Sequence, residues 1–324
     1  MRRREFIGLI GIIGVVWPPV AQPADELKKK MRRIGFLASV PHERIDAFDR
    51  ELREQGYSDG ENIIIVRRFW KNDPEQLAKF AAELVALDVE VIVAPTTPEA
   101  LAAKALTNAI PIVTATADAV GVGLAESFAR PGGNVTGMSD NAIDLSAKRL
   151  ELLKEAVPTV SRIAVLWNER DSAMTQRYRE IDRAAQALGV SIQPLGVREP
   201  DDFERAFSAM NRERPDAMIM VTDVLTNLNR KRVLDYAEAH RIPAMYEFAS
   251  FVREDGLMSY GPSDDYLFGR AAVYVDKILK GAKPSELPAE EPTVYHLVIN
   301  SRTAKKLGFN IPQSLLLRGA ELVQ

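Results

Sequence analysis

The same succession of apolar runs and amphipathic stretches occurs twice along this chain. Each occurrence opens with a short apolar run, at residues 33–37 and again at residues 162–166. An amphipathic stretch follows each run and stops at a glycine, Gly56 or Gly189, where a left-handed helix C-cap is easiest. Short β-rich runs that alternate with helical stretches are typical of a parallel α/β sheet. The repeat therefore predicts two similar Rossmann-like lobes, each a parallel sheet flanked by helices.

Further segments continue the correspondence between the two halves. The helical stretches carry apolar side chains at spacings of three and four, which predicts one buried face per helix. The third apolar run of each half is continuous, as expected when helices cover both faces of a sheet. The predicted second, third and fourth strands are residues 63–66, 89–94 and 110–113 in the first half, and 192–197, 217–221 and 242–245 in the second.

The size and composition of the chain suit two packed cores. It has 324 residues, of which 46% are hydrophobic and 27% are charged. The formal net charge of -3 and the isoelectric point near 5.8 argue against a nucleic-acid-binding surface, because phosphate binding needs a concentrated excess of Lys and Arg. The dense basic clusters, at residues 2–4 and 28–33, both lie at the amino end. We expect no nucleic-acid partner.

The motifs of several common enzyme classes are missing from the sequence. No G-x-G-x-x-G follows the first predicted strand, and no G-x-x-x-x-G-K-[ST] occurs, so no phosphate loop is predicted. The histidines, His42, His240 and His296, are scattered without metal-ligand spacing, and the chain has no cysteine. A G-x-S-x-G elbow is also absent. The sequence therefore predicts no cofactor, metal or catalytic set, which disfavours the rival interpretation as a Rossmann-type transferase.

Residues 1–24 are predicted to be an export signal. The arginines at residues 2–4 precede an apolar stretch, residues 6–17, that is too short to span a bilayer comfortably. The arginine pair at residues 3–4, followed one residue later by Phe6, resembles a twin-arginine signal, and an arginine-rich general secretory leader explains the segment equally well. Without a cysteine the mature protein is not a lipoprotein. We expect a periplasmic protein exported by a twin-arginine-like or Sec signal.

Candidate ligand-binding residues lie in the loops that follow the predicted strands. In open parallel sheets, ligands bind beyond the carboxyl ends of the strands, where loops and helix amino termini converge. These loops contribute Ser39, Thr96, Thr97, Thr116 and Asp118 in the first lobe, and Asn168, Thr222, Asp223, Tyr246 and Glu247 in the second.

Charged and hydroxyl side chains in these loops suggest how a ligand could be held. Thr97 opens a helix start, so its hydroxyl and the free amides that follow could receive a carboxylate. Helix capping would also explain Thr97, and a cap can do both. Asp118, Asp223 and Glu247 could accept an ammonium group from the ligand, or could be ordinary loop carboxylates paired with Lys or Arg.

Three aromatic residues could stack on a planar ligand. They are Trp70, Trp167 and Tyr246. Trp167 ends a predicted strand and can equally pack in the core, so Tyr246 ranks above it. Together, the loops and the aromatic residues predict a small-molecule site between the lobes.

Distinctive longer segments extend from the middle of the chain to its carboxyl end. They are ARPGGNVTG at residues 129–137, KRLELLK at 148–154, GLMSYGP at 256–262, YVDKILKGAKP at 274–284, and LVIN at 297–300 followed by IPQSLL at 311–316. In this order they resemble the ABC-transporter substrate-binding protein family, which includes tryptophan and tyrosine binders. The resemblance implies the type I periplasmic-binding fold, with three hinge crossings between the lobes.

The resemblance also implies how the chain is divided. The first lobe would hold residues 31–139 plus 263–286, and the second residues 140–262 plus 287–324. The crossings would fall in stretches rich in turn residues, near residues 139–141, 261–262 and 288–292.

The function implied by the resemblance is capture of a small organic ligand by cleft closure, without catalysis. The partner would be an ABC permease in the inner membrane, and we expect a monomer with no cofactor. An aromatic amino acid or aromatic carboxylate is favoured as ligand. Residues 117–121 read Ala-Asp-Ala-Val-Gly where the family usually has Gly-Asp-Pro-Val-Gly, so the loop shape departs from the family pattern. A ligand-sensing protein with a signalling partner is the alternative.

Overall fold

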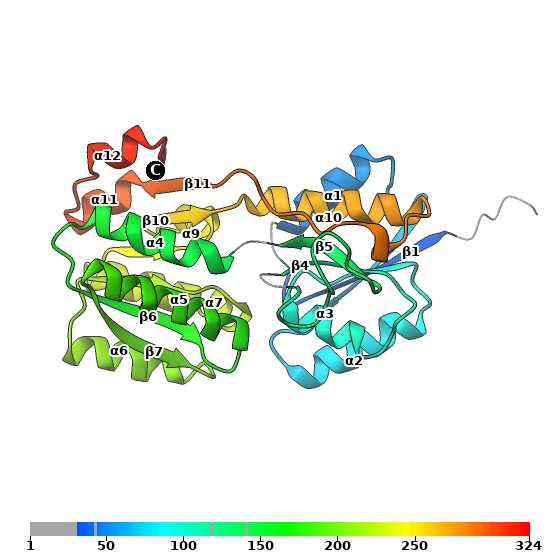
Figure 1. The fold of residues 1–324 in the computed structure, drawn as a ribbon, viewed down its shortest axis with the longest axis horizontal. Helices are drawn as coiled ribbons and strands as arrows, with labels where there is room; N and C mark the ends of the chain where they lie inside the picture. Colours follow the sequence, from blue (N-terminus) through cyan, green and yellow to red (C-terminus); the bar gives the residue numbers. More distant parts are fainter. Residues whose placement is uncertain (1–30, 42–43, 117–118, 140–141) are drawn as a thin grey trace, which may run out of the picture. The chain divides into compact units, whose positions relative to one another are not determined.

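The computed structural model describes residues 31–324 except 42–43, 117–118 and 140–141 (Figure 1). The predicted export signal, the candidate Asp118 and the predicted crossing near residue 140 therefore lie outside the described residues. Within the described part of the chain, no helix is long and apolar enough to cross a membrane.

The first sheet has five parallel strands in the order β2-β1-β3-β4-β5. Helices separate its first four strands along the chain, as the alternating pattern predicts. The elements of this part are β1 (Arg32–Ala38), α1 (Arg44–Glu54), β2 (Ile63–Phe69), α2 (Pro74–Ala86), β3 (Val91–Val93), α3 (Thr97–Lys104), β4 (Ile112–Thr116) and β5 (Val135–Ser139).

The second sheet has seven strands in the order β12-β11-β10-β9-β8-β6-β7. Its neighbours are parallel except β10 and β11, which are antiparallel. The strands are β6 (Arg162–Asn168), β7 (Ser191–Val197), β8 (Ala217–Met220), β9 (Ala244–Tyr246), β10 (Met258–Gly261), β11 (His296–Asn300) and β12 (Glu321–Val323). The helices of this half are α4 (Ala142–Ala156), α5 (Ser172–Leu188), α6 (Asp202–Arg212), α7 (Val224–Leu228), α8 (Arg230–Ala239), α9 (Ala249–Arg253), α11 (Ser301–Leu307) and α12 (Gln313–Leu317).

The strand order of the two halves confirms the duplicated unit. The first half runs β2-β1-β3-β4-β5, and the second half begins with the same order, β7-β6-β8-β9-β10. The predicted fold class, two α/β lobes built on largely parallel sheets, is therefore confirmed. Strands β5 and β10 extend each sheet beyond the four strands that the repeat predicts.

Helix ends follow signals that are visible in the sequence. The side chain of Asp73 accepts hydrogen bonds from the amides of Glu75 and Gln76, and Pro74 at the first position of α2 has no amide to satisfy. At the other end of a helix, Gly189 closes α5 with φ of 64°, a left-handed conformation that glycine adopts without strain. The first signal fixes where α2 begins, and the second fixes where α5 ends.

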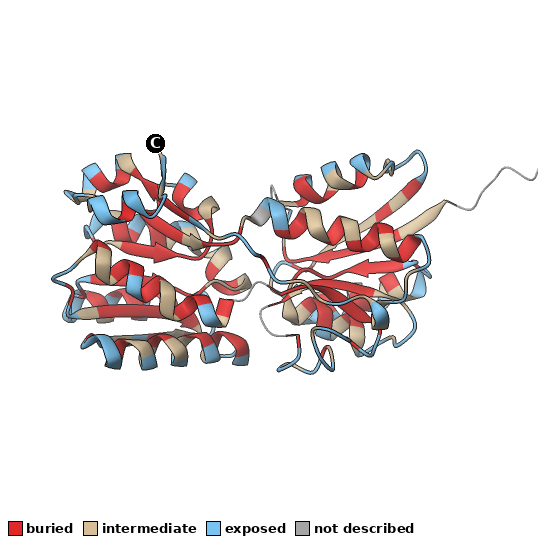
Figure 2. Cartoon of the chain, turned by 45° about the horizontal axis from the view of Figure 1, so that its top comes forward, coloured by how far each residue is buried: buried red, intermediate tan, exposed pale blue. Residues whose placement is uncertain are grey.

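Residues 32–324 form one compact unit in which helices turn a buried face inward (Figure 2). In α1 that face includes Ile45, Phe48 and Leu52, as the spacing predicts. Helix α10 (Asp264–Leu279) comes late in the chain, yet it packs on α1, β4 and β5 of the first half. After α10, the chain returns to the second sheet, where β11 pairs with β10.

Candidate functional site

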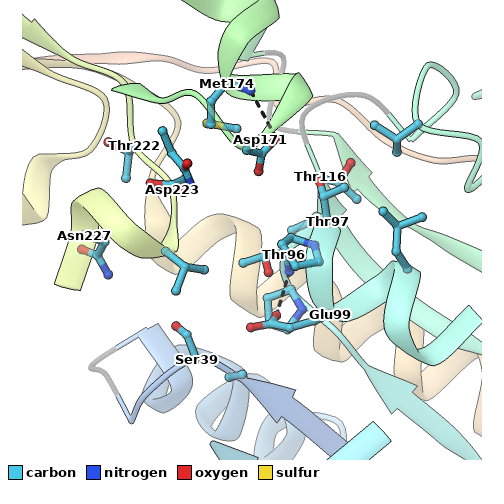
Figure 3. Close-up of a pocket in the computed structure, with 18 of the residues that line it drawn as sticks. Ser39, Thr96, Thr97, Glu99, Thr116, Asp171, Met174, Thr222, Asp223 and Asn227 are labelled. Carbon is cyan, nitrogen blue, oxygen red and sulfur yellow. Dashed lines mark hydrogen bonds between the residues drawn. The ribbon is translucent and has the colours of Figure 1, made fainter. Parts of the chain in front are cut away.

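A cavity of about 580 Å³ is lined by loops at the carboxyl ends of strands from both sheets (Figure 3). Ser39 follows β1 and Thr96 lies shortly after β3, whereas Asn168 ends β6 and Thr222 lies shortly after β8. Strands β1 and β3 are neighbours in the first sheet, and β6 and β8 are neighbours in the second, each pair at the point where the strand order reverses. Open α/β sheets bind ligands at such points, because loops on either side of the reversal leave a crevice. The cavity is therefore the candidate ligand site.

A buried carboxyl group, Glu99, lies beside the cavity in the first half. Glu99 is 0% exposed and is the third residue of α3. Trp70 Nε1 donates a hydrogen bond to Glu99 Oε1 at 2.8 Å, and the Thr96 amide donates to Oε2 at 3.0 Å. Thr96 is the N-cap of α3. The sequence suggested Thr97 as the capping residue, which is one position later. Thr97 thus begins the helix itself and remains part of the cavity lining.

The protonation of Glu99 is set by its surroundings. Burial raises the pKa of Glu99 to about 7, and hydrogen bonds from Trp70, Thr96 and the Ser39 backbone oppose the rise. These hydrogen-bond donors are neutral groups. The carboxyl group therefore changes charge close to neutral pH.

We expect ionisation of Glu99 to lower the stability of the protein between about pH 4.5 and about pH 7. The unfolded chain loses this proton near the ordinary pKa of 4.5, whereas the folded protein keeps it up to a pKa of about 7. The folded state thus binds more protons in this window, and the free energy of unfolding falls by on the order of 3 kcal/mol as pH rises. Urea unfolding at several pH values measures the slope, which Glu99→Gln should reduce; an unchanged slope would contradict this assignment.

Asp223 is the main acidic group that the second half contributes. It is the N-cap of α7, where Oδ1 accepts from the Thr226 amide at 2.9 Å. Oδ2 accepts from Asn168 Nδ2 at 2.6 Å. Burial raises the pKa of Asp223, and the negative charge of Asp171 adds to the rise. A positively charged ligand group would be attracted by both carboxylates.

A buried cluster of charged residues lies behind the cavity wall. Glu247 pairs through Oε1 with Arg149 Nη1 at 3.2 Å and through Oε2 with Arg177 Nη1 at 2.9 Å. These three residues are at most 3% exposed, and Arg177 also lines the cavity. Glu247 therefore supports a residue of the cavity wall.

Most of the predicted candidates come together around the cavity. Figure 3 shows side chains of both halves directed toward it, among them Thr97 and Thr116 from the first and Asp223 from the second. The candidates that line it are Ser39, Trp70, Thr96, Thr97, Thr116, Asn168, Thr222 and Asp223.

Two of the candidates named from the strand ends lie outside the cavity lining. Tyr246 is buried and stacks on Phe251, with ring centroids 5.3 Å apart, and so fills the core. Glu247 is held by the arginine pair described above and does not line the cavity. Trp167, ranked below Tyr246, stacks on Tyr178 with ring centroids 3.9 Å apart and also belongs to the core.

Several lining residues were not selected from the sequence. Glu99, Asp171 and Arg177 contribute charge, and Met174 and Phe248 contribute apolar surface. A signal existed for Glu99, because Thr-x-x-Glu at a helix start is a capping box. The others lie on helices or in loops whose approach to the cavity depends on packing. Within the described residues, no cluster of His, Asp and Glu side chains has the geometry to hold a metal ion.

Comparison with known proteins gives a family match over most of the chain. The model of the ABC transporter substrate binding protein family matches residues 39–323. A curated relative, the tyrosine-binding protein of Clostridioides difficile (strain R20291), is 29% identical over 285 residues, which cover 86% of this chain and 81% of that protein.

Solved structures share the fold. A conserved domain protein from Vibrio cholerae has a TM-score of 0.84 at 27% identity, covering 91% of this chain and all of that one. A protein from Streptococcus pneumoniae in complex with L-Trp has a TM-score of 0.81 at 24% identity, covering 90% of this chain and 99% of that one. A ligand-free, open substrate-binding protein from Clostridium difficile has a TM-score of 0.66 at 27% identity, covering 90% and 99%. The architecture is thus that of type I periplasmic-binding proteins.

Proposed function

The chain belongs to the ABC transporter substrate-binding protein family, and from this premise we propose that its cavity binds an aromatic α-amino acid as the zwitterion. The observation that carries the proposal is the balance of charge in the cavity lining. Among the described lining residues, Arg177 is already paired with Glu247, and the buried Glu99 has a pKa of about 7. The remaining charged side chains are equal in number: Arg44 and Arg170 against Asp171 and Asp223. A ligand with one positive and one negative group matches such a lining better than a sugar or a simple anion does.

The ammonium group is assigned to Asp223. Burial raises the pKa of this carboxyl group, and the charge of Asp171 raises it further, so a cation that contacts both would relieve an unfavourable arrangement. The hydroxyl of Thr222, the preceding residue, is buried without a hydrogen-bond partner among the described residues. An ammonium group has three donors and could satisfy both residues.

The carboxylate is assigned to the start of α3. The amide of Thr97 belongs to the first turn of that helix, where free amides and the helix dipole favour an anion. Ser39, Thr97 and Thr116, which carry hydroxyl groups, also line the cavity. Each can donate a hydrogen bond to a carboxylate oxygen.

The aromatic side chain is assigned to the apolar part of the lining. Met174 and Phe248 come from the second half, and Leu267 and Phe268 come from α10. The relative in Clostridioides difficile is a tyrosine-binding protein, and one similar structure contains L-Trp. Both support an aromatic amino acid over an aliphatic one.

As a member of this family the chain is the solute-binding component of an ABC importer. We propose that it acts in the periplasm as a monomer, exported by a twin-arginine-like or Sec signal at residues 1–24, and that it catalyses no reaction. A ligand that touches both lobes would stabilise a closed state, which the ABC permease would recognise. The proposed lobes are residues 31–139 plus 263–286 and residues 140–262 plus 287–324.

Thermal unfolding and calorimetry with chosen ligands test the proposal. We expect L-tyrosine, L-tryptophan or L-phenylalanine to raise the melting temperature, because a ligand that binds only the folded state stabilises it by about 2.7 kcal/mol at 100 times Kd. Tyramine lacks the carboxylate and 3-phenylpropionate lacks the ammonium, so both should bind far more weakly. Tighter binding of either analogue, or of myo-inositol, would contradict an amino acid as ligand.

A further inference from the structure

We propose that Glu99 is a positioning residue for the ligand, which holds Trp70 and the Thr96–Thr97 turn in the arrangement that the ligand binds. Its carboxyl oxygens face two different segments, with Trp70 Nε1 on one at 2.8 Å and the Thr96 amide on the other at 3.0 Å. Glu99 lies at the cavity lining but is 0% exposed, and Trp70 and Thr97, which line the cavity beside it, present its effect to a ligand. The choice of probe ligands rests on the proposed function, whereas the link between Glu99 and Trp70 does not.

The segment that carries Trp70 needs such a link. Trp70 directly follows β2 and is followed by Lys71 and Asn72, which have φ of 52° and 63°. Two successive residues other than glycine in the left-handed region are costly, and surrounding contacts must hold them there. Backbone hydrogen bonds from Trp70 to Ala38 and from Lys71 to Ser39 hold the main chain beside β1. The ring packs in a buried apolar cluster, and the indole bond to Glu99 adds a directional contact that orients it.

The same carboxyl group shapes the start of α3. As the third residue of the helix, Glu99 reaches back to the amide of the N-cap Thr96, which is the capping-box arrangement. This bond fixes the entry of the chain into α3 and therefore the direction of the Thr97 amide. One buried carboxyl group thus joins the aromatic wall and the proposed carboxylate-binding turn.

The bonding pattern predicts how a substitution acts. In Glu99→Gln, the amide oxygen can accept from Trp70 or from Thr96, but the NH₂ group then faces the other donor. We expect at least about tenfold weaker binding of L-tyrosine or L-tryptophan, equivalent to about 1.4 kcal/mol. Trp70→Phe keeps an aromatic ring and removes the donor, so it should weaken binding less when Glu99 is already Gln than in the unchanged protein. Glu75→Gln, at an exposed position of α2, is the matched control and should bind normally.

A measurement that needs no ligand tests the link directly. Since the indole donates to a group whose pKa is about 7, the emission of Trp70 should change with pH around neutrality, measured with the other two tryptophans, Trp17 and Trp167, replaced by Phe. Glu99→Gln should abolish that change, and Glu75→Gln should not. Other charges in the cavity lining also act on Trp70, and the Glu99→Gln variant separates their effect from that of Glu99. These charged residues are Arg44, Arg170, Asp171, Arg177 and Asp223.

The outcomes separate this proposal from the proposed function. A folded Glu99→Gln variant with unchanged affinity, or with the pH-dependent emission of the unchanged protein, overturns the positioning role; thermal unfolding establishes that the variant is folded. If no amino acid binds the unchanged protein, the proposed function fails, and the emission titration then decides whether Glu99 holds Trp70. Loss of the emission change together with weaker binding supports the proposal.

Discussion

A free energy of unfolding lower by about 3–5 kcal/mol is expected when Glu247 is replaced by Gln. Glu247 is 2% exposed and lies between Arg149 and Arg177, which are 1% and 3% exposed. Removing its charge leaves two buried guanidinium groups without the carboxylate that joins them, and the desolvation of both is then poorly compensated. Urea unfolding measures the loss. Ligand affinity should fall as well, because Arg177 lines the cavity.

An exposed ion pair in the same half provides the matched control. Glu254 pairs with Arg230 at 2.8 Å, and the Arg230 and Glu254 side chains are 37% and 44% exposed. Glu254→Gln should therefore change the free energy of unfolding by less than about 1 kcal/mol. If the two glutamine variants lost equal stability, the buried cluster would not have the structural role that its burial indicates.

Binding about 100-fold weaker or more is expected when Asp223 is replaced by Asn. This substitution removes the charge assigned to the ligand ammonium, and loss of one partner of a buried charge pair costs several kcal/mol of binding energy. The fold should persist, because an Asn side chain can still cap α7 by accepting from the Thr226 amide. Calorimetry with L-tyrosine or L-tryptophan measures the change, and thermal unfolding without ligand tests the fold.

The control for this substitution is another aspartate at a helix start. Asp201 is the exposed N-cap residue of α6 and makes no side-chain capping bond there. Asp201→Asn should leave affinity within about twofold of the unchanged protein, since surface substitutions away from special features have small effects. An Asp223→Asn variant that binds as tightly as Asp201→Asn would exclude Asp223 as the ammonium partner.

Most residues chosen because they follow the carboxyl ends of strands line the cavity, but a side chain at a strand end can also point into the core. Ser39, Thr97, Asn168 and Asp223 were selected because parallel strands deliver their loops to one edge of the sheet, and all four line the cavity. Tyr246 ends β9 by the same rule, yet its ring packs on Phe251. The direction of a side chain at a strand end depends on the helices that cover the sheet, so local sequence does not predict it.

The charged residues behind the cavity illustrate a different gap. Arg149 and Arg177 stand on α4 and α5, far along the chain from Glu247, and their burial was not expected from residues that usually face water. Packing of α4 against β9 and β10, and of α5 against α4 and β6, brings the three together. Glu99 was closer to prediction, since the capping box is local, but its bond to Trp70 joins segments that are separated in the chain.

The sequence by itself indicated two α/β lobes and the strand ends beside which a ligand could bind, because hydrophobic periodicity, caps and repeats are local features of the chain. The order of the strands in each sheet came from the tertiary structure. The tertiary structure decided which loop side chains reach the cavity and which charges are buried beside it. Those properties depend on long-range packing, in which the burial of Glu99, Arg149 and Glu247 is settled by residues distant in the chain.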